Sequence, residues 1–229
     1  MSELLAVLEE HQDPDDVLML ADAVASLLSL RVRPLRIPTS EASVSAVVAE
    51  VAAASVSAAV LRGHPDPDAM FWEVIQQSRK PIVVTPFGDA DLSRPIARVL
   101  LPLDGTPETA KAVNPTVGRL LASGAEVLAA HVFDASTVPA FWDQAAHSRE
   151  PWTREFLLRN LPAVHRLDLR SGQPPEEILA ESEDMGSDLI LLGWSQRLAG
   201  DRAPIVRLAL EGNVPLMLVG TETGQSKPG

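Results

Sequence analysis

Acidic and histidine side chains gather in two loops of the N-terminal half. Each loop follows an apolar segment, and together the loops contain Glu9, Glu10, His11, Asp13, His64, Asp66 and Asp68. Carboxylates and imidazole nitrogens could hold a divalent metal if the loops met. The same acids suit the first turn of a helix, where they cap free amides and oppose the helix dipole. Because the two histidines lack a strict ligand spacing, we interpret these residues as helix caps and predict no metal site.

Familiar catalytic motifs are missing from the chain. It has no HExxH, no nucleophile elbow and no complete phosphate-binding loop. It also has no cysteine, which excludes thiol catalysis, disulfides and thiolate metal sites. His131 and His165 lie in predicted strands, and no serine or threonine is spaced to use either as a base. We therefore predict no catalytic residues and a protein that is not an enzyme.

Composition and charge limit the partners of the chain. Of its 229 residues, 46% are hydrophobic, which is enough for one large or two small cores. The net charge of −12 argues against nucleic acid or a membrane surface as the main partner, because either requires clustered lysine and arginine. No apolar run reaches the about 18 residues of a membrane span. The N-terminus carries acids where a signal peptide carries basic residues, so we expect a cytoplasmic protein.

Apolar segments alternate with helical patterns throughout the chain. The predicted strands are 4–8, 31–37, 56–63, 81–87, 97–103, 126–134, 164–172, 187–193 and 214–220. The predicted helices are 17–30, 40–55, 69–79, 107–122, 174–186 and 203–213, with a helix in two pieces around Pro151. This alternation predicts an α/β fold with a parallel sheet and right-handed crossovers. Pro34 removes a backbone donor from its strand and places it at a sheet edge. The alternating pattern of 164–172 also indicates an edge strand.

The two halves of the chain repeat one pattern. Segment 56–63 matches 187–193, and 79–87 matches 213–220. The second half has an additional helix and strand over 138–172. We therefore interpret the first half as a copy that has lost one helix–strand unit. The predicted domains are 1–90 and 96–221, followed by a disordered tail, 222–229.

The second half resembles a universal stress protein domain over nearly its whole length. The resemblance rests on the motifs PLDGTPET, ASGAEVLAAHV, SGQPPEEILAESEDMGSDLILLG and VPLMLVG. It implies a tandem pair of Rossmann-like domains of the adenine nucleotide alpha hydrolase type. The second domain would have a five-stranded parallel sheet in the order 3-2-1-4-5, and the first would be a shortened, four-stranded copy. The fifth strands would pair edge to edge, either within the chain or between chains of a homo-oligomer.

The resemblance also implies a site for ATP or another adenine nucleotide. Members that bind ATP carry an aspartate after the first strand, an apolar contact at the end of the second and a glycine-rich loop after the fourth. The residues that match these positions or flank them are Asp104, Gly105, Val132, Gly193 and Ser195. The phosphate loop departs from the family pattern, because Gln196 replaces its second glycine and Arg202 and Ala203 stand near its end. Whether a nucleotide binds is therefore open.

The resemblance implies a non-enzymatic stress-response protein. The alternatives are a nucleotide-independent scaffold for an unidentified protein partner and a weak ATP hydrolase. Four aromatic residues in the additional segment admit two interpretations, packing over the sheet or a lid or partner surface over the second crevice. They are Phe141, Trp142, Trp152 and Phe156.

Overall fold

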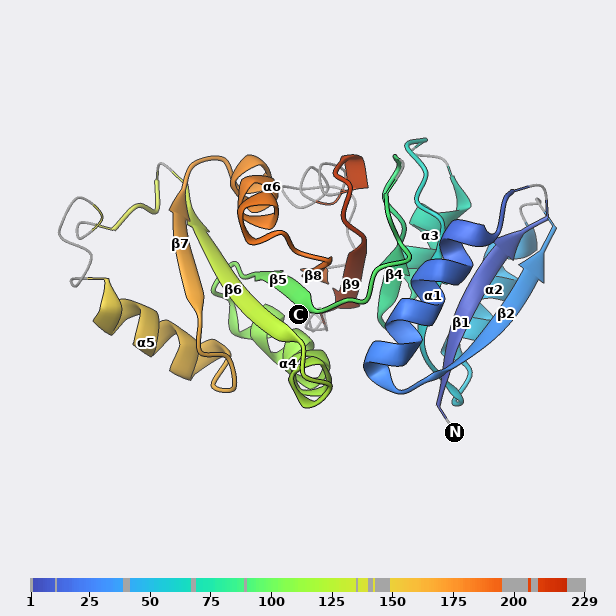
Figure 1. Ribbon diagram of the computed structural model, residues 1–229, viewed down its shortest axis with the longest axis horizontal. Coiled ribbons are helices and arrows are strands. Elements are labelled where there is room, and N and C mark those ends of the chain that lie inside the picture. The colour runs from blue at the N-terminus through green and yellow to red at the C-terminus, as the bar shows by residue number, and fades with distance from the viewer. Residues whose placement is uncertain are drawn as a thin grey trace, which may run out of the picture.

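The structure, a computed structural model, describes residues 2–10, 12–38, 42–66, 69–88, 90–134, 136–139, 142, 149–194, 206 and 210–221. The strands are β1 (Glu3–Glu9), β2 (Arg31–Ile37), β3 (Val56–Leu61), β4 (Ile82–Val84), β5 (Arg98–Pro102), β6 (Glu126–Phe133), β7 (Leu167–Ser171), β8 (Leu189–Trp194) and β9 (Leu216–Gly220). The helices are α1 (Asp15–Leu28), α2 (Ala42–Ala52), α3 (Met70–Gln77), α4 (Pro107–Ala122), α5 (Glu150–Asn160) and α6 (Pro174–Met185). Strands and helices alternate as predicted (Figure 1).

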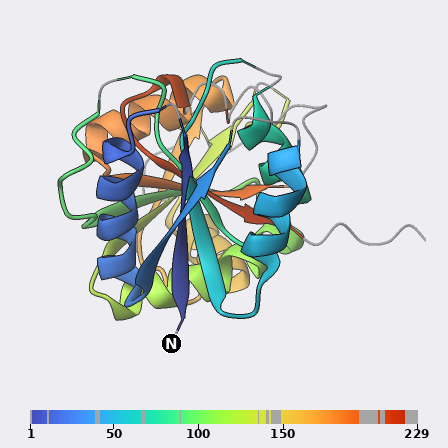
Figure 2. The ribbon, with the colours of Figure 1, turned by 90° about the vertical axis from the view of Figure 1, so that its right-hand side faces the viewer.

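All nine strands form one sheet in the order β2-β1-β3-β4-β9-β8-β5-β6-β7. The second half contributes β7-β6-β5-β8-β9, which is the 3-2-1-4-5 order that the resemblance implies. The first half contributes only β2-β1-β3-β4, so its missing strand would lie beyond β2, at the sheet edge. Every pairing is parallel except that of β4 with β9. Helices cover both faces, with α1 and the α2–α3 pair on opposite sides (Figure 2).

The central strands are apolar because both of their faces are buried. In β5, Val99 and Leu101 face one core cluster, together with α1, α4 and α5, while Leu100 faces the other, together with α2, α3 and α6. Parallel strands covered by helices on both sides have continuous apolar runs of this kind. By contrast β2 is largely exposed or half-buried, and Pro34 lies in it at the predicted edge.

The two halves join through their fifth strands. In the antiparallel pairing of β4 with β9, Val83 lies opposite Met217, and both side chains are fully buried. The predicted edge-to-edge pairing therefore occurs within one chain. It makes the two half-sheets one continuous sheet.

The sequence predicts two helical pieces separated at Pro151. Pro151 lies in the first turn of α5, which corresponds to the second piece, and the first piece falls largely outside the described residues. A helix tolerates proline there, since the amide that proline lacks would have no intrahelical partner. The preceding segment, most of the predicted helix 203–213 and the tail 222–229 lie outside the described residues.

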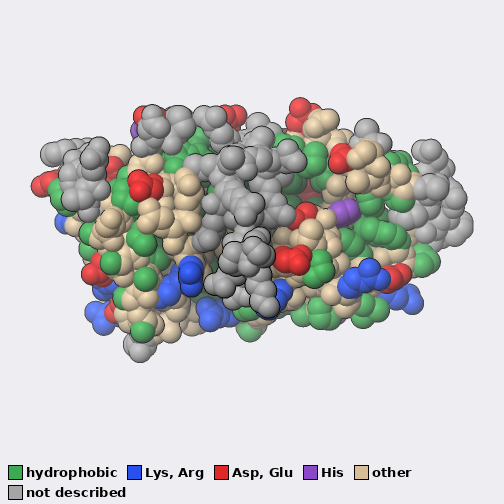
Figure 3. Space-filling view, turned by 180° about the vertical axis from the view of Figure 1, so that it is seen from behind, with side chains coloured by type: hydrophobic (Ala, Val, Ile, Leu, Met, Phe, Trp, Pro, Cys, Tyr) green, Lys and Arg blue, Asp and Glu red, His purple; other side chains and the backbone are tan. Residues whose placement is uncertain are grey.

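On the face shown in Figure 3, acidic and basic side chains are spread over both halves, with apolar side chains between them. None of the helices within the described residues is long and apolar enough to cross a membrane.

Candidate functional site

The turn between β5 and α4 is held together by Asp104. Its Oδ1 accepts hydrogen bonds from the backbone N and the Oγ1 of Thr106, at 3.0 and 2.8 Å. Its Oδ2 accepts one from Thr109 Oγ1 at 3.1 Å. Thr106 caps α4 by accepting from the backbone N of Thr109, and Pro107 occupies the first turn. Gly105 between them has φ +80°, a conformation that glycine adopts without strain. The predicted strand-to-helix turn is therefore present.

Gly193 lies next to this turn, in contact with the methyl group of Thr109. A Cβ atom built on Gly193 would lie 2.5 Å from Thr109 Cγ2, so only glycine permits this approach. Thr109 is buried, and it contacts Asp104 through its hydroxyl and the Gly193 backbone through its methyl group. Because β5 and β8 are neighbouring parallel strands, this contact lies where their carboxyl ends meet. Open α/β sheets bind ligands at such a point, where the strand order reverses.

The other predicted site residues lie in different surroundings. Val132 lies near the carboxyl end of β6, half-buried against the core cluster that contains Ile178 and Leu192. Ser195 falls outside the described residues. The structure thus joins Asp104, Gly105 and Gly193 at one point and places Val132 on the strand beside β5.

Sequence reasoning missed Thr109. The sequence feature that could have identified it is its position three residues after Thr106, because residues three apart on a helix are neighbours. It also missed Trp194, which follows Gly193 and is almost fully buried. The backbone carbonyl of Trp194 accepts a hydrogen bond from the N of Thr221 at 2.7 Å, which ties the end of β8 to the end of β9.

An aromatic cluster packs on the other side of Gly105. It comprises His131, Phe133, Trp142, Trp152 and Phe156. The Trp152 and Phe156 rings stack with centroids 4.9 Å apart. A Cβ on Gly105 would lie 3.3 Å from Phe156 Cε2. Packing of Phe156 over the sheet is confirmed, because it belongs to the core cluster of β5 and α4. Phe141 lies outside the described residues.

His131 is the titratable member of the aromatic cluster. Its Nδ1 lies 2.7 Å from the carbonyl oxygen of Leu103, to which it must donate. Burial lowers the pKa of His131, and the hydrogen bond to Leu103 only partly opposes this shift. The imidazole is therefore neutral near pH 7, and its Nδ1 proton is committed to the backbone.

The loops of the first half make local hydrogen bonds and an ion pair, while Pro14 and Ala69, the N-caps of α1 and α3, have no side-chain cap hydrogen bond. Asp13 Oδ1 accepts from the backbone N of Asp15 at 3.0 Å, and His64 Nδ1 accepts from the N of Asp66 at 3.1 Å. Arg62, which follows β3, pairs with Asp16 of α1 at 3.1 Å. Within the described part of the chain, no three His, Asp or Glu side chains are placed to hold a metal. His11 and Asp68 lie outside that part.

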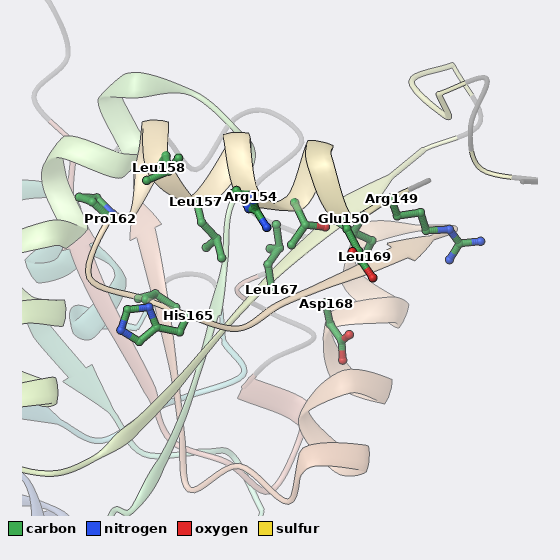
Figure 4. A pocket seen from close by; sticks show the side chains of 12 residues that line it. Arg149, Glu150, Arg154, Leu157, Leu158, Pro162, His165, Leu167, Asp168 and Leu169 are labelled. Atoms are coloured by element: carbon green, nitrogen blue, oxygen red, sulfur yellow. The ribbon is translucent and has the colours of Figure 1, made fainter. Parts of the chain in front are cut away.

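A separate cavity of about 560 Å³ lies between α5 and β7, at the outer edge of the sheet (Figure 4). It is two strands away from β5. Its walls include Leu157 and Leu158 of α5 and Leu167 and Leu169 of β7. None of the residues predicted to bind a cofactor lines it.

Comparisons with known proteins bear on the family and the fold of the chain. Residues 95–221, more than half of the chain, match the model of the Universal stress protein family. No curated protein matches the sequence.

The fold is similar to three solved structures of low sequence identity. A functionally unknown protein from Pseudomonas aeruginosa PAO1 has a TM-score of 0.68 at 12% identity, covering 97% of this chain and 93% of that one. A putative universal stress protein from Pseudomonas aeruginosa UCBPP-PA14 has a TM-score of 0.62 at 12% identity, covering 97% and 94%. A universal stress protein from Archaeoglobus fulgidus has a TM-score of 0.60 at 13% identity, covering 96% and 86%. These likenesses concern the fold.

Proposed function

Because the chain belongs to the universal stress protein family, we propose that it is a non-enzymatic, cytoplasmic regulator of the stress response. We further propose that its second half binds an adenine nucleotide where β5 and β8 end. The observation that carries this second proposal is the contact of Thr109 with both Asp104 and Gly193. We also propose the division into a shortened domain, 1–90, and a complete one, 96–221.

The site offers suitable groups for a nucleoside. Asp104 is exposed, and each carboxylate oxygen can accept more than one hydrogen bond, so its present partners leave capacity for ribose hydroxyls. Val132 offers an apolar side chain on the neighbouring strand for the base. The N-terminus of α4 begins at Pro107, after Gly105 and the capping residue Thr106, and helix N-termini favour anions.

A regulatory role agrees with the chemistry of the described residues. Burial lowers the pKa of His131, next to the β5–α4 turn, and keeps its imidazole neutral. Its Nδ1–H donates a hydrogen bond to the carbonyl oxygen of Leu103. The hydroxyls of Thr106 and Thr109 each donate to Asp104. These groups support binding and local structure better than proton transfer to a substrate.

The Asp104→Ala variant tests the site. Calorimetric titration with ATP, ADP and AMP, with and without magnesium, should show binding to the native chain that weakens about tenfold or more in the variant, because a charged acceptor is lost. Asp91→Ala is a matched control. Asp91 is also an exposed aspartate that bonds a hydroxyl two residues later, at Ser93, but it precedes the second half. Equal affinity of the Asp104→Ala variant and the native chain would remove Asp104 from the site.

A nucleotide-independent scaffold is the second candidate. The observation that favours it is that Asp104 already accepts hydrogen bonds from Thr106 and Thr109 within the protein. The sequence adds that Gln196 stands in place of a loop glycine. A flat titration of the folded native chain would favour this candidate. Phosphate release above a protein-free control would instead indicate a weak ATP hydrolase.

A further inference from the structure

The outer edge of β7 carries unused strand-pairing groups. In the described sheet, β7 has one neighbour, β6. The N of Ala129 donates to the carbonyl of Arg166, and the N of Gly172 donates to the carbonyl of Phe133. Because the backbone groups of a strand point alternately to its two sides, those of Leu167, Leu169 and Ser171 point away from β6. An edge of this kind can pair with another strand.

The space beside this edge is a groove whose walls combine leucines with polar and charged side chains, among them Arg149, Glu150 and Arg154. Figure 4 shows Leu157 of α5 and Leu167 of β7 pointing toward each other across the cavity of about 560 Å³ between the two elements. Leu157 and Leu158 line it from the helix, and Leu167 and Leu169 line it from the strand. Leu158 is 67% exposed, an unusual state for a leucine in the wall of a groove. The groove can therefore receive apolar side chains of a strand added to β7.

The opposite face of β7 carries two charges of opposite sign, two residues apart. Arg170 forms ion pairs with Glu181 and with Asp184 of α6, while Asp168 is exposed. Burial raises the pKa of Glu181, and the nearby charge of Asp168 adds to this shift.

We propose that a second copy of this chain docks on β7 by antiparallel strand pairing about a two-fold axis at Leu169. In this register Leu169 exchanges backbone hydrogen bonds with Leu169 of the second copy. Asp168 then lies opposite Arg170 of the second copy, and Arg170 opposite Asp168. Opposite charges across an antiparallel pair stabilise it. The leucines of both strands share the groove side, where Leu158 of each α5 covers them.

Neighbouring registers are disfavoured by charge. An axis at Asp168 would oppose two aspartates, and an axis at Arg170 would oppose two arginines. An axis at Leu167 would pair Asp168 with Arg166, which lies outside β7, whereas the axis at Leu169 is centred on β7 and pairs all five of its residues. The other end of the sheet suits pairing less, because Pro34 removes a donor from β2 and arginines are frequent in that strand. The proposal does not depend on nucleotide binding.

Sedimentation and light scattering of the full chain at physiological ionic strength test the proposal. The native protein should show a reversible dimer with twice the mass of the 24.5 kDa chain. Leu158→Glu and Asp168→Lys should each weaken dimerisation by about tenfold or more, because each places an unfavourable charge at the interface. Met19→Glu is the matched control. It adds the same charge at another exposed large apolar side chain, on α1, and should leave the dimer intact.

A cross-link tests the register. The chain has no cysteine, so a Leu169→Cys variant carries a single thiol. Opposed residues of a hydrogen-bonded antiparallel pair lie about 5.5 Å apart at Cα, within disulfide reach. Oxidation with diamide should give a covalent dimer, whereas an Arg36→Cys variant on β2 should remain uncoupled. A native chain that stays monomeric overturns the proposal. So does a dimer that is insensitive to both edge substitutions and does not cross-link through Leu169→Cys.

Discussion

Thr109 is the residue on which the candidate site depends. Its hydroxyl binds Asp104 and its methyl group fills the space beside Gly193, so one buried side chain connects the ends of two strands. Sequence reasoning found the two residues at either end of this contact but not the one between them. The cap formed by Thr106 is local and has a sequence signature. The approach of Gly193 to Thr109 joins residues far apart in the chain, and no local spacing encodes it.

Gly193→Ala should destabilise the protein by about 1–3 kcal/mol, because the added Cβ would lie 2.5 Å from Thr109 Cγ2. Urea unfolding measures this. Thr109→Ser removes that methyl group but keeps the hydroxyl, so the double variant should recover part of the loss. Gly118→Ala is the control. Gly118 lies within α4 with no atom within 4 Å of its Cβ position, and alanine there should stabilise by about 0.5–1 kcal/mol. Strictly additive effects of the Gly193 and Thr109 substitutions would show that the contact is absent.

Among the elements, α5 is fixed by aromatic packing against β6. Trp152 and Phe156 of α5 surround His131, and Phe133 contacts Trp152 with ring centroids 5.2 Å apart. The sequence predicted two helical pieces separated at Pro151, and α5, which begins at Glu150, corresponds to the second of them. Most other strands and helices were predicted within a few residues. Their apolar runs and caps are local signals, whereas the packing of α5 depends on which strand lies beneath it.

Stability should fall as the pH is lowered below about 6.5, in part because of His131. Burial lowers the pKa of this imidazole in the folded protein from its ordinary value of 6.5. His131 therefore binds a proton at a higher pH in the unfolded chain than in the native chain. Its contribution to the free energy of unfolding is complete above the pKa of the unfolded chain and is lost as the pH falls through the pKa of the folded protein.

The His131→Asn variant retains a donor for Leu103 but does not titrate. Urea unfolding at several pH values should show a shallower decline of its unfolding free energy than that of the native chain over the same range. Identical slopes for the two proteins would mean that His131 takes up its proton equally well in both states.

At the scale of the whole molecule, the β4–β9 pairing makes one sheet from two repeats. The α-carbon register aligns Ile82 with Leu218 and Val84 with Leu216, and all of these side chains are buried. Each core cluster contains residues of both halves. The resemblance of the two halves to one family implied this pairing of their fifth strands. Composition alone could not predict it, because an apolar edge strand can pair within a chain or between chains.

Because the two halves share their core and their sheet, they should unfold together. Hydrogen exchange in β1 and in β6 should report the same opening free energy, and urea unfolding should follow a single transition. Val83→Ala removes buried methyl groups at the β4–β9 pairing. It should lower the opening free energies of β1 and of β6 together, by about 1–3 kcal/mol. Separate transitions, or a loss confined to β1, would show that the halves are independent folding units.

The central claim is a nucleotide site at the ends of β5 and β8, and calorimetry of the native chain with ATP tests it most directly. Mass spectrometry should first establish that no ligand is retained from purification. The account predicts saturable heat with an affinity in the micromolar range. A flat trace from ligand-free, folded protein would contradict it and would leave the nucleotide-independent scaffold as the function.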